Sequence, residues 1–273
     1  MKHIMLDAYG ADESRLNDVK YINNSLNLIA EKIGVVTVAP PFLLPYYYGL
    51  EPEDVGISSF VFLKGGHITI HTFPLRECYF VDMVFDGEFD AEKTRGLFKK
   101  AFPFDESKSE FLAEDRDQVK TYERPFNPEE IFGPHIFAKI VAKKEPTLDS
   151  IFDFLEALIP ELNMTPIIRP YVIKNAITNP TYLSGIVMIA ESHISFHYNL
   201  TTKIIYFDIF SCKMFDYSKI VKLLSKKLGT VTSYVVIARG SKHKFNKASK
   251  GNHHPISGKV KAYNSAWKDN IFK

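Results

Sequence analysis

The sequence predicts an α+β fold of two homologous β-α-β halves, with antiparallel sheets that carry helices on their outer faces in a four-layer αββα sandwich. The first observation is an internal repeat, because residues 64–73 (KGGHITIHTF) align with residues 190–199 (AESHISFHYN). The second is the strict alternation in HITIH and HISFH, which places the histidines of each block on one face of a strand. The third is a helical pattern upstream of each block.

Each expected half contains the same elements in the same order. Apolar residues at steps of three and four predict an amphipathic helix over residues 16–33 in the first half and over residues 148–158 in the second. A further helix near Ala91 and another near Tyr217 are each followed by a strand. With helices on only one face of each antiparallel sheet, the other face is either exposed or covers something between the two copies.

The expected boundaries follow from the repeat and from a polar, proline-containing stretch between its copies. Residues 1–124 form the N-terminal half, residues 125–132 the linker and residues 133–273 the C-terminal half. Within the last of these, residues 240–273 form a basic, loop-like tail, which is interpreted as a solvated segment rather than a nucleic-acid contact.

The composition favours a globular, cytoplasmic protein. Its 34 basic and 32 acidic residues nearly cancel, so no overall charge would attract nucleic acid. Two cysteines, Cys78 and Cys212, are too few for a disulfide framework and fit a reducing cytosol. The N-terminus has no apolar signal-peptide core, and no stretch approaches about 18 unbroken apolar residues. We therefore expect neither secretion nor contact with a membrane.

Four side chains of the second half stand in a chemically specific pattern. Ser192 follows Glu191 directly, with Ser184 eight residues before it, His197 five residues after it and Cys212 twenty residues after it. This pattern resembles the processing and catalytic motif of the prokaryotic-type S-adenosylmethionine decarboxylases, and the resemblance extends over both halves. It implies a chain that cuts itself between Glu191 and Ser192.

The resemblance also implies a covalent cofactor made from the chain itself. The Ser192 hydroxyl would attack the Glu191 carbonyl to give an ester, and elimination would leave an N-terminal pyruvoyl group. Its carbonyl is the electron sink that decarboxylation needs and that ordinary side chains lack. The substrate amine would condense with it as a Schiff base, and Cys212 would return a proton to Cα. The implied function is a carboxy-lyase of polyamine and spermidine biosynthesis, nominally acting on S-adenosylmethionine.

The two halves are not equivalent. At the position of the pyruvoyl residue the first half has Gly66, and at the position of the thiol it has Asp86, or Phe85 if the alignment shifts by one. It keeps Ser58 and His71. Similarity to the fused eukaryotic members of the family implies that this Ser and His assist processing from the opposite half. The alternative is a site that uses the Ser and His of the second half itself.

The substrate is less well supported than the reaction. The family holds its nucleoside with a Phe six residues before the processing Ser and a carboxylate four residues after the processing His. The first position holds Pro52 and Thr178 here, and the second holds Leu75 and Thr201. Glu77 could bind ribose hydroxyls instead, and Tyr48 could stack on a purine. The alternative is the same chemistry on arginine or ornithine, substrates to which members of the family have shifted.

The same sequence features leave other functions and partners to consider. Histidines four residues apart on one strand are about 13 Å apart, too far for two ligands of one ion at roughly 2.1 Å each, so we expect no metal site. A non-catalytic regulatory paralogue of a decarboxylase and a binding module without chemistry are the competing classes. We expect a small amino-acid-type substrate and a monomer of two halves or a homodimer.

Overall fold

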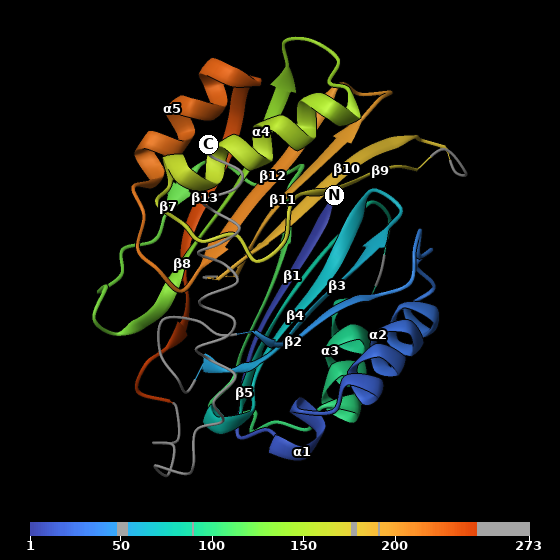
Figure 1. Ribbon diagram of the computed structural model, residues 1–273, viewed down its shortest axis with the longest axis vertical. Helices are drawn as coiled ribbons and strands as arrows, with labels where there is room; N and C mark the ends of the chain where they lie inside the picture. Colours follow the sequence, from blue (N-terminus) through green and yellow to red (C-terminus); the bar gives the residue numbers. More distant parts are fainter. Residues whose placement is uncertain (48–53, 89, 176–178, 191, 245–273) are drawn as a thin grey trace.

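The chain forms two largely antiparallel sheets that face each other, with helices on the outer faces, so the predicted α+β sandwich is confirmed (Figure 1). The computed structural model describes residues 1–47, 54–88, 90–175, 179–190 and 192–244. Helices α2 and α3 cover one sheet, and helices α4 and α5 cover the other. None of the helices in these described ranges has the length and apolar content that a membrane crossing requires.

The first half supplies a six-stranded sheet in the order β2-β3-β4-β5-β1-β6. Its elements, followed by the short strand β7, are β1 (Lys2–Tyr9), α1 (Glu13–Leu16), α2 (Val19–Ile33), β2 (Phe42–Tyr47), β3 (Gly56–Leu63), β4 (Gly66–Phe73), the 3₁₀ helix η2 (Pro74–Arg76), β5 (Cys78–Phe85), α3 (Ala91–Ala101), β6 (Glu110–Asp115) and β7 (Tyr122–Glu123).

The second half supplies a seven-stranded sheet in the order β7-β13-β8-β12-β11-β10-β9. Its elements are β8 (Ile131–Ala142), α4 (Leu148–Glu161), β9 (Tyr171–Asn175), β10 (Tyr182–Ile189), β11 (Ser192–Asn199), β12 (Ile204–Ser211), α5 (Tyr217–Lys227) and β13 (Gly229–Ser241). Strand β7 pairs with β13 in parallel, so a segment from before residue 125 belongs to this second sheet. Strand β8 begins inside the range expected for the linker.

Local sequence explains where the helices begin and end. The helix expected over residues 16–33 is divided into α1 and α2, because the Asp18 side chain accepts a hydrogen bond from the Tyr21 amide and caps a new helix. Helix α2 ends at Gly34, whose φ of 85° is the left-handed conformation that glycine adopts without a Cβ penalty. Thr147 and Ser150 cap α4 reciprocally.

The strand registers confirm the alternation that the repeat predicts. Ser58 of β3 pairs with His71 of β4, and the equivalent Ser184 of β10 pairs with His197 of β11. The residues between the histidines, such as Ile68, are buried against the helices in the outer core. The histidines therefore point the other way, into the space between the two sheets.

Two buried arginines join the halves across this inner space. Arg116, just after β6 of the first half, contacts Asp208 of β12 at 3.3 Å and donates to two backbone carbonyls of the second sheet. Arg239 of β13 contacts Asp7 and Asp82 of the first sheet at 2.7 and 2.8 Å. Each half thus places a guanidinium among the carboxylates of the other, and the halves are fixed face to face.

Candidate active site

Ser192 stands at the first position of β11 and faces the first half. Its Oγ lies 3.0 Å from Nε2 of His71 and 3.3 Å from Nδ1 of His193. Nδ1 of His71 lies 2.9 Å from Oγ of Ser58. The structure thus places the serine of the second half in contact with the Ser and His of the first half, all three buried.

The backbone at Ser192 is in an unusual conformation. Its φ is +148°, in the positive region that favours glycine, and such strain persists only where the surroundings hold it in place. The equivalent residue of the first half is Gly66, where an added Cβ would lie 1.8 Å from the carbonyl oxygen of Val84. A serine therefore has no room at the equivalent position in the first half.

The other Ser-His pair does not contact Ser192. Oγ of Ser184 lies 2.9 Å from Nδ1 of His197, and Nε2 of His197 lies 2.8 Å from Nδ1 of His67. His67 follows Gly66, just as His193 follows Ser192. Nε2 of His71 likewise lies 3.0 Å from Nδ1 of His193, so the chains Ser58-His71-His193 and Ser184-His197-His67 are copies of one arrangement. Only the first of them contacts a serine at the start of the strand.

Burial determines the charge of these imidazoles. Removal from water lowers the pKa of His71 well below its usual range, and the neighbouring His193 lowers it further. Burial likewise lowers the pKa of His197 to about 3. His71 is therefore neutral near pH 7, with one ring nitrogen able to accept a proton from the Ser192 hydroxyl.

A small cavity lies at Ser192. Its wall includes Ser58, His71, Ser192 and the half-buried Cys212, together with the apolar rings of Phe73, Phe132 and Phe210. Its volume of about 10 Å³ has room for about one water molecule. The cavity thus brings a hydroxyl, an imidazole and a thiol to one small space.

Glu77, one of the two residues expected to bind a substrate, is not among the described residues of this wall. Glu77 follows η2 as a half-buried residue with a φ of 50°, and its backbone carbonyl accepts a hydrogen bond from the Ala11 amide. Tyr48 and Glu191 lie outside the described residues. Asp54, which the sequence did not single out, does line the cavity, and its Oδ1 accepts a bond of 2.6 Å from Arg76.

Comparison with known proteins gives the family. The family model described as S-adenosylmethionine decarboxylase matches residues 2–113 and 142–240, which is more than half of the chain. The chain belongs to the S-adenosylmethionine decarboxylase family.

Individual members of the family match over shorter stretches. An S-adenosylmethionine decarboxylase proenzyme of Geobacillus sp. (strain WCH70) is 28% identical over 89 residues, which are 33% of this chain and 66% of the relative. The proenzyme of Clostridium tetani (strain Massachusetts / E88) is 34% identical over 73 residues, 27% of this chain and 52% of the relative. The matches therefore span about half to two thirds of these relatives.

A solved structure of the same family was also found. It is the adenosylmethionine decarboxylase from Aquifex aeolicus VF5, with 18% sequence identity and a TM-score of 0.36. The match covers 45% of this chain and 96% of that one.

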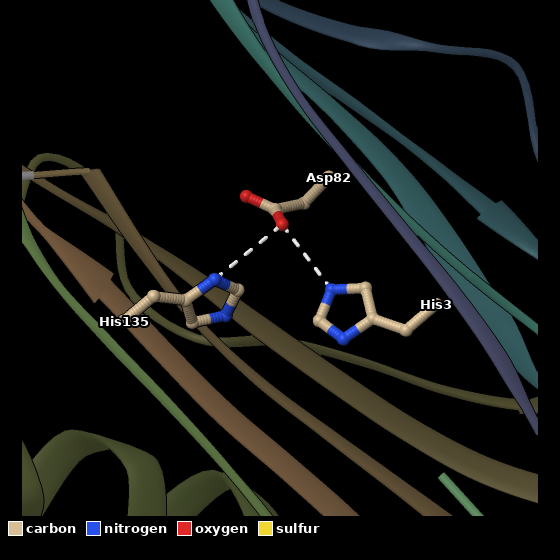
Figure 2. Close-up of side chains that lie close together, drawn as sticks. All are labelled: His3, Asp82 and His135. Carbon is tan, nitrogen blue, oxygen red and sulfur yellow. Dashed lines mark hydrogen bonds and ion pairs between the residues drawn. The ribbon is translucent and has the colours of Figure 1, made fainter. Parts of the chain in front are cut away.

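This member of the family also has a polar interior that sequence reasoning missed. Figure 2 shows Asp82 between His3 and His135, with Oδ1 at 3.2 Å from Nε2 of His3 and 3.7 Å from Nδ1 of His135. A similar group, His193 and Asp208, lies beside Ser192. The available signal was the repeat itself, because MKHIMLDAYG and GPHIFAKIVA align His3 with His135.

Proposed function

We propose that this chain is a self-processing, pyruvoyl-dependent decarboxylase of polyamine biosynthesis, with S-adenosylmethionine as its nominal substrate. The observation that carries the proposal is the 3.0 Å contact between Oγ of Ser192 and Nε2 of the neutral His71. Membership of the decarboxylase family supports it.

The surroundings of Ser192 fit self-cleavage. Nδ1 of His71 is held by Oγ of Ser58 at 2.9 Å, and its Nε2 lies 3.0 Å from both Oγ of Ser192 and Nδ1 of His193, so Nε2 can take the Ser192 hydroxyl proton. As the proton leaves, Oγ bonds to the carbonyl carbon of Glu191, and the peptide bond to the Ser192 nitrogen breaks. The nitrogen takes the proton, and residues 191 and 192 are then joined by an ester.

The ester is resolved by elimination. Loss of the Cα proton of residue 192 to His71 breaks the bond from Cβ to the ester oxygen, and Glu191 leaves as a free carboxylate. Water then replaces the nitrogen of residue 192, which departs as ammonia. Water supplies the ketone oxygen and the nitrogen leaves as ammonia. The conversion therefore needs no oxidant or reductant.

The cavity wall suits the later decarboxylation. A pyruvoyl group at residue 192 supplies the carbonyl that accepts the electrons a departing carboxylate leaves behind. Cys212 lies in the same wall and can hold the proton that returns to the substrate Cα. The rings of Phe73, Phe132 and Phe210 exclude water, which favours the loss of a charged carboxylate as neutral carbon dioxide.

The size of the cavity sets the order of events. With room for about one water molecule, it cannot hold an amino acid in the continuous chain. We therefore expect substrate to bind only after cleavage has released the start of β11 from the residue before it.

Arginine or ornithine is the second candidate substrate, and specific positions favour it. Where the family has a carboxylate for the nucleoside, this chain has Leu75, which is apolar and partly exposed, and Thr201, which is exposed. Neither side chain can bind a pair of ribose hydroxyls as a carboxylate does. The acid in the described cavity wall, Asp54, would suit a cationic substrate of either kind.

Two experiments test the proposal. Denaturing mass spectrometry of the purified chain should show two fragments divided between Glu191 and Ser192, the second lighter by one ammonia than a fragment that begins with serine. An intact chain alone would favour the non-catalytic regulatory paralogue. Release of labelled carbon dioxide from S-adenosylmethionine, arginine and ornithine identifies the substrate, and release from arginine or ornithine alone would overturn the nominal one.

A further inference from the structure

Three side-chain atoms that lack hydrogen-bond partners meet between the sheets. They are Nε2 of His67, Nε2 of His193 and Oδ2 of Asp208, and none of the three finds a hydrogen-bond partner in the described part of the chain. All three residues are fully buried. The three residues offer ligand atoms that lie within 4.8 Å of one another. Buried polar atoms without partners are costly, so such a convergence calls for an occupant.

The hydrogen-bond chains behind the two histidines allow both rings to keep a lone pair on Nε2. If Nδ1 of His197 donates to Ser184, its Nε2 accepts from Nδ1 of His67, and Nε2 of His67 keeps a lone pair. On the other side, Nδ1 of His193 lies 3.0 Å from Nε2 of His71 and 3.3 Å from Oγ of Ser192, and donation to either one leaves a lone pair on Nε2 of His193. The two histidines can then each offer a lone pair, and Asp208 a carboxylate oxygen, within 4.8 Å of one another.

The second group of histidines already has its cation. At the cluster in Figure 2, Nη1 of Arg239 lies 2.8 Å from Oδ1 of Asp82 and 3.1 Å from Nδ1 of His135, so the guanidinium occupies both acceptors. Oδ2 lacks a hydrogen-bond partner in both aspartates. The difference between the two clusters is that Arg116 contacts Oδ1 of Asp208, at 3.3 Å, without a hydrogen bond to an imidazole among the described residues.

We propose that His67, His193 and Asp208 bind a divalent first-row transition metal of the zinc type. Two imidazoles and one carboxylate are a common ligand set for such ions, with water in the fourth position. In a tetrahedral site with metal–ligand bonds of about 2.1 Å, the donor atoms lie about 3.4 Å from one another. The observed 3.6 Å between Nε2 of His193 and Oδ2 of Asp208 is close to that spacing.

The proposed site draws its ligands from two sheets, so it avoids the distance that separates histidines on one strand. Histidines of a single strand remain too far apart to share an ion, but His67 lies on β4 and His193 on β11, which belong to opposite sheets. Only the face-to-face packing of the two sheets brings these two rings to the same carboxylate. A metal here would lie beside Ser192 without being needed for the proton transfer to His71.

The test is the metal content of the whole chain after expression in zinc-supplemented and in cobalt-supplemented medium. The wild-type chain should hold about one ion by elemental mass spectrometry, and the cobalt form should show the visible absorption of a low-symmetry four-coordinate site. Ser192→Ala cannot be cut and should still hold the ion, so a failure of the metal proposal is separate from a failure of self-processing.

His67→Gln removes one ligand, and His3→Gln is its control in the cluster that Arg239 already occupies. We expect His67→Gln to lower the metal content at least about tenfold and His3→Gln to leave it unchanged. A wild-type chain that holds less than about a tenth of an equivalent in both media would overturn the proposal. So would a folded His67→Gln chain that binds as much metal as the wild type. If His67→Gln does not fold, the cobalt spectrum of the wild-type chain is the test. Absorption of a low-symmetry four-coordinate site supports the proposal, and its absence overturns it.

Discussion

Oγ of Ser192 lies 3.0 Å from Nε2 of His71, although the two residues belong to opposite sheets and are 121 positions apart. His197, the counterpart of His71 in the second half, contacts His67 instead. This crosswise pairing follows from the packing of two copies of one unit face to face, because each polar face then meets the other copy. The intact half therefore depends on the degenerate one for its candidate base.

Removing the hydroxyl that orients His71 should slow self-cleavage. Ser58→Ala deletes the 2.9 Å partner of Nδ1, and a hydrogen bond of this kind contributes about 1 kcal/mol, so we expect cleavage to be roughly five- to tenfold slower. Ser184→Ala removes the equivalent bond to His197 and is the matched control. The fraction of cut chain against time, measured on denaturing gels, checks this. Equal rates in the two variants would contradict the role of Ser58.

Restoring a serine to the first half should not create a second processing site. A Cβ at residue 66 would lie 1.8 Å from the carbonyl oxygen of Val84, so Gly66→Ser should destabilise the fold by at least about 2 kcal/mol. Gly96→Ser is the control, because nothing lies within 4 Å of a Cβ there. Denaturant unfolding measures the loss. A stable Gly66→Ser chain that is also cut before residue 66 would show that the clash is relieved.

The sequence predicted the faces of the strands but not what each face meets. Period-two alternation placed His67 and His71 on one face, and the repeat placed Ser58 beside His71, because both features depend only on neighbouring strands. The distance from Ser192 to His71 depends on how one sheet lies over the other, which no strand pattern determines. Asp208 was missed for the same reason.

Breaking the ion pairs that join the halves should be costly. Arg239→Met leaves Asp7 and Asp82 buried without their guanidinium, and the expected loss in free energy of unfolding is about 3–5 kcal/mol. Lys99→Met removes an exposed pair with Glu106 and should cost less than about 1 kcal/mol. Urea unfolding of both variants makes the comparison. Similar losses would mean that Arg239 does not hold the halves together.

The buried histidines should make the fold sensitive to acid. Burial lowers the pKa of His197 to about 3, whereas an unfolded histidine titrates near 6.5. Between these values the unfolded chain binds more protons, so stability is fully present above about pH 6.5 and falls as the pH falls toward 3. For this one residue the loss from pH 6.5 to pH 5 is about 2 kcal/mol.

His197→Gln removes that contribution and should give a shallower dependence of unfolding free energy on pH than the wild-type chain. Urea unfolding between pH 7.5 and 5 measures both slopes. Identical slopes would mean that His197 is not neutral in the folded chain.

The rate of self-cleavage in His71→Gln and in His197→Gln tests the central claim most directly, with thermal unfolding as the check that both variants fold. Loss of a general base lowers a rate typically about 10²- to 10⁴-fold, so His71→Gln should leave the chain almost uncut. His197→Gln should be cut within a few-fold of the wild-type rate, since its side chain contacts Ser184 and His67 and not Ser192. Cleavage that persists in His71→Gln and stops in His197→Gln would contradict a site shared across the two halves.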